Sequence, residues 1–190
     1  GKRLGVHQKL RDEGGGGRTL LVSAIALFIM PLPSFSQPAT LPSPPGEKPG
    51  YEDRHPAGLF SRILTAHGHE LVMGNARSFQ IIPVRPSETF SADVPEIFVV
   101  FQLHQHESEF KVYGRWVVEK GEGVPANHLL GTDAMLLMTE DESGYLSLKR
   151  PPTGWPVGDY KVKIFTGTGA SDMDPIGTLR FKVLPAKAAS

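Results

Sequence analysis

Residues 153–165 read TGWPVGDYKVKIF, and this short stretch indicates the fold of the whole chain. A proline fixes its own backbone angle φ and biases the residue before it toward extended geometry, and a glycine permits a tight reversal. The Trp-Pro pair and the glycine after it therefore end a loop. Beyond them Tyr160, Val162 and Ile164 alternate with more polar residues, which is the period-two pattern of a strand with one face in the core. The stretch predicts a loop that leads into an inner strand of a β-sheet.

The same alternation recurs through the C-terminal two thirds of the chain, in segments separated by polar, Gly-containing or Pro-containing turns. These segments are SFQIIPV (78–84), PEIFVVFQLHQH (95–106), FKVYGRWVVE (110–119), DAMLLMTED (133–141), GYLSLKR (144–150) and GTLRFKVL (177–184). Such alternation leaves each sheet one face in water, so we expect antiparallel sheets that bury their other faces against each other. The pattern predicts an all-β fold, a single antiparallel β-sandwich of about seven strands over residues 78–185.

The alternation also predicts which side chains face the core and which face water. Phe101 is expected to face the core, whereas Phe98 and Val100 of the same strand are expected on the outward face. In the next strand Trp116 is expected inside. In the last strand Thr178 is expected in water.

The first part of the chain is interpreted as an export signal. Residues 19–32, TLLVSAIALFIMPL, suit the apolar centre of a signal peptide better than a membrane span, which needs about 20 residues. The small residues Ser34 and Ser36 predict cleavage after Ser36. Residues 1–36 are then leader and signal peptide, and Gln37 begins the mature chain. We therefore expect a periplasmic or secreted protein with no membrane span after cleavage.

Three further segments lie around the expected sandwich. Residues 37–58 are rich in Pro and Gly with almost no apolar periodicity, which is typical of a disordered tether. Residues 59–77 are ambiguous between a short helix and an edge strand ahead of the sandwich. Residues 186–190 are expected to be a disordered tail.

The overall composition excludes several classes of function. The chain has 20 Lys plus Arg and 20 Asp plus Glu, so its formal net charge of zero argues against a nucleic-acid partner. The chain has no cysteine, which excludes disulfides, thiolate zinc sites, a cysteine nucleophile and a lipoprotein anchor.

The predicted sandwich resembles immunoglobulin-like domains at several positions. Tyr160, two residues before the core position Val162, resembles the tyrosine corner, in which the tyrosine folds back to bond a backbone group. Trp116 resembles the buried tryptophan of strand C. Val162 and either Phe101 or Leu103 would then take the places where antibody domains carry their inter-sheet cysteines.

A closer resemblance covers about residues 78–185. The motifs FSADVPEIFVVFQL, GRWVVEK, GWPVGDYKVKIFTG and GTLRFKV resemble a group of exported bacterial immunoglobulin-like β-sandwich domains of the Trp-Pro-x-Gly-x-Tyr-x-Val type. The resemblance implies an immunoglobulin-like fold and an extracytoplasmic setting. It carries no catalytic residues.

Trp155 has two readings. As a plug it closes the end of the sandwich and packs on apolar neighbours. As an exposed anchor it offers a partner or a carbohydrate the side chain most favoured at binding hot spots. We expect the plug.

Two His-x-His pairs are the candidate metal ligands, His67 with His69 and His104 with His106. On a strand, residues two apart share a face, so both rings of a pair can reach one ion. Neutral imidazole suits zinc or copper. The bland alternative is a pair of solvated histidines, and two ligands do not by themselves make a site.

Catalytic motifs are not found. The chain has no Gly-x-Ser-x-Gly nucleophile elbow, and the carboxylates of TEDES (139–143) are typical of a solvated turn. We expect no catalytic residues and no obligatory cofactor. The leading hypothesis is a non-enzymatic binding or assembly module with a protein or envelope partner. The alternatives are a periplasmic copper or zinc protein that uses the His-x-His pairs, and an accessory subunit of an envelope complex.

Overall fold

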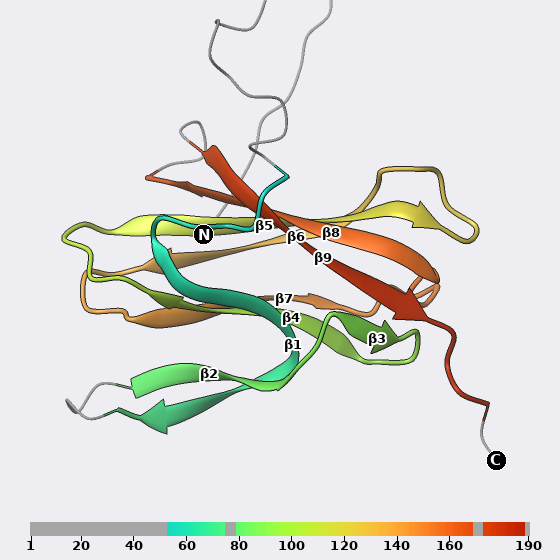
Figure 1. Ribbon diagram of the computed structural model, residues 1–190, viewed down its shortest axis with the longest axis horizontal. Coiled ribbons are helices and arrows are strands. Elements are labelled where there is room, and N and C mark those ends of the chain that lie inside the picture. Colours follow the sequence, from blue (N-terminus) through green and yellow to red (C-terminus); the bar gives the residue numbers. More distant parts are fainter. Residues whose placement is uncertain (1–52, 75–78, 169–172, 189–190) are drawn as a thin grey trace, which may run out of the picture. The chain divides into compact units, whose positions relative to one another are not determined.

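The computed structural model describes residues 53–74, 79–168 and 173–188. These residues form nine strands and no helix, in two sheets that share one hydrophobic core (Figure 1). The expected all-β sandwich is confirmed, with nine strands instead of about seven. The expected signal peptide, the cleavage site before Gln37 and residues 37–52 of the expected tether lie outside the described residues.

The first sheet has four strands in the order β2-β1-β4-β7, and each neighbouring pair is antiparallel. Their bounds are β1 (Phe60–Met73), β2 (Phe79–Pro86), β4 (Glu96–Leu103) and β7 (Ser143–Lys149). The second sheet has five strands in the order β3-β9-β8-β5-β6. Their bounds are β3 (Thr89–Ser91), β5 (Phe110–Gly121), β6 (His128–Leu137), β8 (Gly158–Gly167) and β9 (Asp174–Leu184).

Strands β1 and β3 account for the difference in strand number. The ambiguous segment 59–77 contains β1, which pairs with both β2 and β4 and is therefore an inner strand, neither a helix nor an edge strand. Strand β3 has only three residues, too few for an alternating pattern to predict it. It pairs with β9 in parallel, Phe90 opposite Val183, so the sandwich is not purely antiparallel.

The expected inner faces form the core. Phe101, Trp116, Tyr160 and Val162 are each 1% exposed or less. The core also receives alternating residues of β4, β5, β8 and β9, as the period-two pattern predicts. Burial of these apolar faces against each other is the main force that holds the two sheets together.

The outward face of β4 differs from the expectation. Val100 was expected in water but is 1% exposed, because the β1–β2 end of the first sheet curls back over the outer face of β4 and β7 (Figure 1). The ring of His69 stacks on Tyr145 of β7 with 3.8 Å between centroids. The backbone N–H of Ile81 donates to the Ser143 hydroxyl at 2.8 Å. This curl adds a second, smaller apolar contact outside the main core.

The last strand is also covered on one edge. The Thr178 N–H donates to the carbonyl of Arg54 at 2.7 Å, and Thr178 is 4% exposed where water was expected. At Gly177 a Cβ would lie 2.5 Å from the Pro56 nitrogen, so only glycine allows the chain to approach this closely. Residues 53–58, at the end of the range expected to be a tether, thus lie along β9.

The division of the strands between the two sheets can be compared with that of immunoglobulin-like sandwiches. Strands β4 and β7 lie in one sheet and β5, β8 and β9 in the other. Immunoglobulin-like sandwiches divide strands B and E from strands C, F and G in the same manner. Trp116 lies on β5 and Tyr160 on β8, which are neighbours in the second sheet.

Candidate functional site

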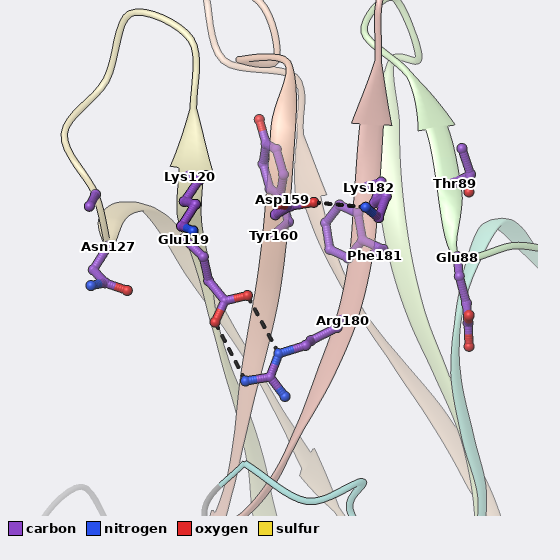
Figure 2. Close-up of a pocket in the computed structure, with 11 residues that line it drawn as sticks. Glu88, Thr89, Glu119, Lys120, Asn127, Asp159, Tyr160, Arg180, Phe181 and Lys182 are labelled. Carbon is purple, nitrogen blue, oxygen red and sulfur yellow. Dashed lines mark hydrogen bonds and ion pairs between the residues drawn. The ribbon is translucent and has the colours of Figure 1, made fainter.

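An open groove of about 760 Å³ runs over the outer face of the second sheet (Figure 2). Its charged lining comes from β5, β8, β9 and the segment before β3. These residues are Glu88, Glu119, Lys120, Asp159, Arg180 and Lys182. Three are acidic and three are basic, so the lining has no net charge.

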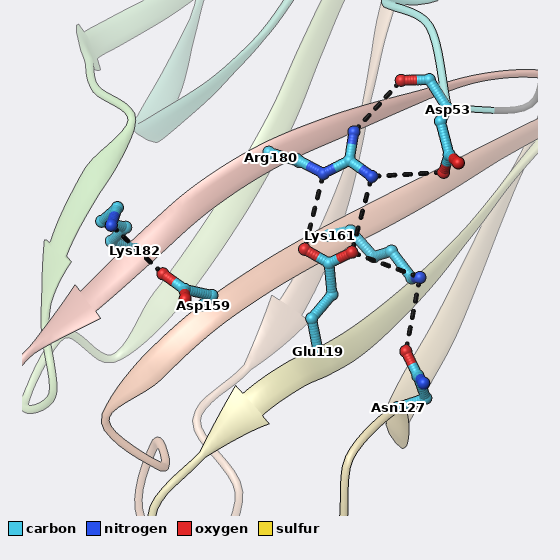
Figure 3. Close-up of polar contacts among 7 residues, drawn as sticks. All are labelled: Asp53, Glu119, Asn127, Asp159, Lys161, Arg180 and Lys182. Atoms are coloured by element: carbon cyan, nitrogen blue, oxygen red, sulfur yellow. Dashed lines mark hydrogen bonds and ion pairs between the residues drawn. The ribbon is translucent and has the colours of Figure 1, made fainter. Parts of the chain in front are cut away.

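Most of these charges already have partners within the chain (Figure 3). The Arg180 guanidinium lies 3.4 Å from Glu119 through Nε and 3.2 Å from the Asp53 carboxylate through Nη2. Lys161 Nζ lies 3.4 Å from the other oxygen of Glu119. Lys182 lies 3.3 Å from Asp159. The second sheet therefore carries a ladder of ion pairs along its outer face, which is partly buried at Lys161 and Glu119 and more exposed at Lys182 and Asp159.

These ion pairs fit a structural role better than a catalytic or ligand-binding role. Partial burial lowers the pKa of Arg180, but the bonds to Glu119 and Asp53 outweigh this effect and raise the pKa above its ordinary value. A guanidinium held between two carboxylates is not free to bind a phosphate or a substrate carboxylate. The two contacts to Asp53 instead fix the point at which the preceding chain meets the sandwich.

The first His-x-His pair does not converge on one point. His67 lies against Phe90 of β3, with 4.7 Å between ring centroids, and its Nδ1 lies 2.9 Å from the Arg85 carbonyl. His69 stacks on Tyr145, and its buried Nδ1 has no hydrogen-bond partner among the described residues. The two rings therefore serve packing contacts on different strands.

The second pair lies beyond its strand, because β4 ends at Leu103. His104 and His106 line a polar groove of about 630 Å³ that also includes Glu140, Asp141 and Glu142. His106 Nε2 lies 2.8 Å from the Met138 carbonyl and is already engaged. Across the described part of the chain, no group of three His, Cys, Asp or Glu residues is placed to hold a metal ion. The structure brings the histidines and the acidic turn together but does not arrange them as ligands.

The predicted structural residues close one end of the sandwich. Trp155 is 3% exposed, packs in the core and donates from Nε1 to the Val94 carbonyl at 2.8 Å, as the plug reading requires. Tyr160 donates from its hydroxyl to the Pro156 carbonyl. Desolvation by burial raises the pKa of Tyr160 above its ordinary value.

One surface feature was missed at the sequence level. Leu71 and Met73 of β1 and Phe79 of β2 are each at least 60% exposed. The register places Met73 opposite Phe79 and Leu71 opposite Ile81, so these side chains gather at the end of the β1–β2 hairpin where the two strands are connected. We call Leu71, Met73 and Phe79 the hairpin patch. Residues 71–82 contain several large apolar side chains. Because residues 59–77 were ambiguous between a helix and a strand, the sequence did not predict that these side chains share one face.

The comparisons with known proteins assign no function to these surfaces. No protein-family model matches the sequence, and a comparison with curated proteins finds no match either. Within the described ranges there is no helix with the length and apolar character needed to cross a membrane.

Proposed function

We propose that this chain is a non-enzymatic, immunoglobulin-like module, exported to the periplasm or secreted, that binds or assembles with a protein partner. The hairpin patch is the observation that carries the proposal. Large apolar side chains scattered singly over a surface are ordinary, but a contiguous group marks a site of interaction. Here Leu71, Met73 and Phe79 are 61%, 72% and 60% exposed on paired strands.

The strand edges near the patch favour contact through side chains over the addition of a strand. An unpaired edge is a template for another strand unless its backbone groups are blocked. On β2 the Ile81 N–H is taken by Ser143, and Pro83 has no N–H to offer. On β7 the Ser147 N–H is taken by the Asp133 carboxylate at 2.8 Å. A partner at this end therefore gains most from the apolar side chains.

Export is supported by the sequence before the sandwich. The apolar run of residues 19–32 and the small residues before Gln37 are those of a cleaved signal peptide. A Pro-rich segment of the kind at 37–52 gives reach to a module that binds a partner at a distance from other parts of an assembly. An accessory subunit of an envelope complex is one form of this same function.

The test places a photo-crosslinking phenylalanine analogue at position 79 of the exported chain. The same analogue at Leu184, which is 49% exposed on β9, is the matched control. We expect protein adducts from position 79 and far fewer from position 184. If positions 71, 73 and 79 all give no more adducts than position 184, the proposed binding function is wrong.

A further inference from the structure

The outer face of the second sheet carries another open groove, toward the other end of β5 from the ladder of ion pairs. We call it the aromatic groove. Its volume is about 410 Å³, and its lining residues are Lys111, Tyr113, Arg115, Ala134, Phe165 and Met173. On β5 the residues Lys111, Tyr113 and Arg115 alternate with buried residues such as Val112, so their side chains share the outer face.

Two aromatic rings form the apolar part of this groove. The register places Tyr113 of β5 directly opposite Phe165 of β8, and the rings meet edge to face with 5.8 Å between centroids. Both side chains are half-buried, so each leaves ring surface open to the groove. Leu136 of β6 lies opposite Lys111 on the same face and is 55% exposed. Aromatic residues, Met and Arg are the side chains enriched at the centres of protein interfaces, and this groove contains all three kinds.

Two cations flank the rings. Lys111 and Arg115 lie two residues to either side of Tyr113 on β5. Within the described ranges neither of them forms an ion pair and no carboxylate lines the groove, whereas the cations of the ladder are each held by a carboxylate. Lys163, opposite Arg115, already has a partner and is not part of the site argued for here. The groove thus combines apolar ring surface with positive charge on both sides of it.

We infer that the aromatic groove is a docking surface for an extended acidic protein segment with a large apolar side chain between two carboxylates. The apolar side chain packs against Tyr113 and Phe165 and is removed from water. The carboxylates pair with Lys111 and Arg115. These two cations are about 13 Å apart along β5, which is the spacing of residues four apart on an extended segment.

This docking surface is independent of the hairpin patch. The patch lies on β1 and β2 of the first sheet, whereas the aromatic groove lies on β5, β6 and β8 of the second sheet. A module with both surfaces can bind two partners at once. The inference therefore goes beyond the proposed function and has a test of its own.

The shape and charge of the groove disfavour other occupants. A planar membrane surface meets the rim of a groove but does not enter it. Nucleic-acid binding draws its affinity from many phosphate contacts, and the lining offers two cations. A symmetric contact with a second copy places Lys111 and Arg115 near their own counterparts and adds like-charge repulsion.

The test uses the full chain and three fluorescent peptides in anisotropy titrations. The first is Glu-Ser-Tyr-Ser-Glu, which when extended presents its Glu and Tyr side chains on one face. The second replaces Tyr by Ser, and the third replaces both Glu by Lys. We expect the Glu/Tyr peptide to bind most tightly, with an affinity that weakens as salt is raised because exposed charges are screened.

Two variants separate the charge from the apolar contact. Lys111→Gln with Arg115→Gln removes both cations, and should weaken binding of the Glu/Tyr peptide about three-fold or more. Phe165→Thr removes ring surface and should weaken binding by a similar factor or more. Threonine is favoured in strands, so the sandwich should stay folded, which near-ultraviolet circular dichroism checks. If Phe165→Thr does not fold, the double variant decides the outcome.

Matched controls lie outside the groove. Arg62→Gln with Lys149→Gln also removes one Arg and one Lys, both exposed on strands of the first sheet. Leu184→Thr removes an apolar side chain that is 49% exposed on β9. Both controls should bind the Glu/Tyr peptide as the parent chain does. Equal loss in the controls and in the test variants would overturn the inference, and so would equal binding of the Glu/Tyr and Lys/Tyr peptides.

Further probes assign the groove elsewhere if the inference is wrong. Binding of single-stranded DNA or anionic vesicles that depends on Lys111 and Arg115, without binding of the Glu/Tyr peptide, would overturn it. Self-association lost in the Lys111→Gln, Arg115→Gln variant, again without peptide binding, would overturn it equally.

The outcomes also separate this inference from the proposed function. If the Glu/Tyr peptide binds as expected but position 79 gives no protein adducts, the aromatic groove stands without the hairpin patch. If position 79 gives adducts but the Glu/Tyr peptide does not bind, the proposed function stands and the acidic partner is wrong.

Discussion

The hydroxyl of Tyr160 donates a hydrogen bond to the backbone carbonyl of Pro156, four residues earlier in the chain. The bond ties the end of the loop before β8 to the strand itself. The Tyr160 ring is fully buried and stacks on Phe181 of β9 with 5.0 Å between centroids. One side chain thus joins the loop, β8 and β9 at the end of the sandwich, which is the role that a tyrosine corner has.

Replacement of Tyr160 by Phe should lower the free energy of unfolding by about 1–2 kcal/mol, because it leaves the Pro156 carbonyl without its partner while the ring still packs. Urea denaturation measures the change. Tyr113→Phe is the matched control, since Tyr113 lies on the outer face of β5 and is only partly buried; it should change stability by less than about 0.5 kcal/mol. Equal effects of the two changes would contradict a structural role for the bond.

Alkaline pH should destabilise the domain through the same residue. Burial raises the pKa of Tyr160, so the folded chain holds its proton at a pH where the unfolded chain has lost it. Ionisation of Tyr160 therefore does not change the free energy of unfolding below the ordinary pKa of about 10. Above that pH the free energy of unfolding falls by up to about 1.4 kcal/mol per pH unit. Tyr160→Phe starts less stable and has no phenol to ionise at this position, so its urea midpoint and that of the parent chain, measured from about pH 8 to 11, should converge above about pH 10. Curves that stay parallel would show that the pKa of Tyr160 is the same in the folded and the unfolded chain.

Trp155 should emit as a buried tryptophan. With Trp116 replaced by Phe, we expect a blue-shifted emission that acrylamide quenches poorly, because Trp155 is 3% exposed and bonded to Val94. Trp155→Phe should then cost about 1–3 kcal/mol, since the partly buried Val94 carbonyl loses its donor. A red-shifted, readily quenched emission from the folded domain would restore the anchor reading and make this loop a candidate binding surface.

Gly177→Ala should detach residues 53–57 from β9 without unfolding the sandwich. The new methyl group meets the Pro56 nitrogen and the Arg54 carbonyl, at 2.5 and 2.6 Å, and both are backbone atoms that cannot rotate away. Hydrogen exchange at Thr178 should accelerate because its N–H loses the Arg54 carbonyl. Gly123→Ala is the control, since Gly123 also has a positive φ but a Cβ there would meet no atom within 4 Å. Unchanged exchange at Thr178 would show that the segment does not depend on this close approach.

His69→Ala should loosen the β1–β2 hairpin locally. The ring loses its stacking on Tyr145 and its contact with Phe98, and such contacts contribute about 0.5–1.5 kcal/mol. Amide exchange in residues 80–84 should accelerate by about three- to ten-fold, while β5 and β8 remain protected. His104→Ala, at an exposed position beyond β4, is the control and should leave both regions unchanged. Acceleration throughout the sandwich would mean that the hairpin and the main core open as one unit.

The parts of the fold that the sequence predicted are those set by local pattern. The alternation around Phe101, Trp116 and Val162 predicted their burial, because a strand with one wet face repeats with period two whatever it packs against. The Trp-Pro and Gly residues before Tyr160 predicted the loop and the corner for the same local reason. The errors fall where a distant segment covers a face: Val100 under the curled hairpin, and Thr178 under residues 53–56.

The candidate surfaces show the same division. The His-x-His spacing predicted two pairs of rings on common faces, yet β4 ends before His104, and His67 and His69 pack on different strands. The hairpin patch depends on the pairing of Met73 with Phe79, and the groove of His104 and His106 depends on the approach of Gln80 to Glu142, which is 62 residues away. No local pattern predicts a contact across such a separation.

The sequence by itself determined the class of the fold, the core positions and the absence of cysteine chemistry, because backbone periodicity and residue type are properties of short segments. Only the tertiary structure decided that β1 is an inner strand, that the first sheet curls over its own outer face and that Gln80 of β2 meets the acidic turn at Glu142. These features come from pairing between segments far apart in the chain. Such pairing follows from the shape and burial of the whole core, since loop closure over long separations depends on the combined gain of many contacts.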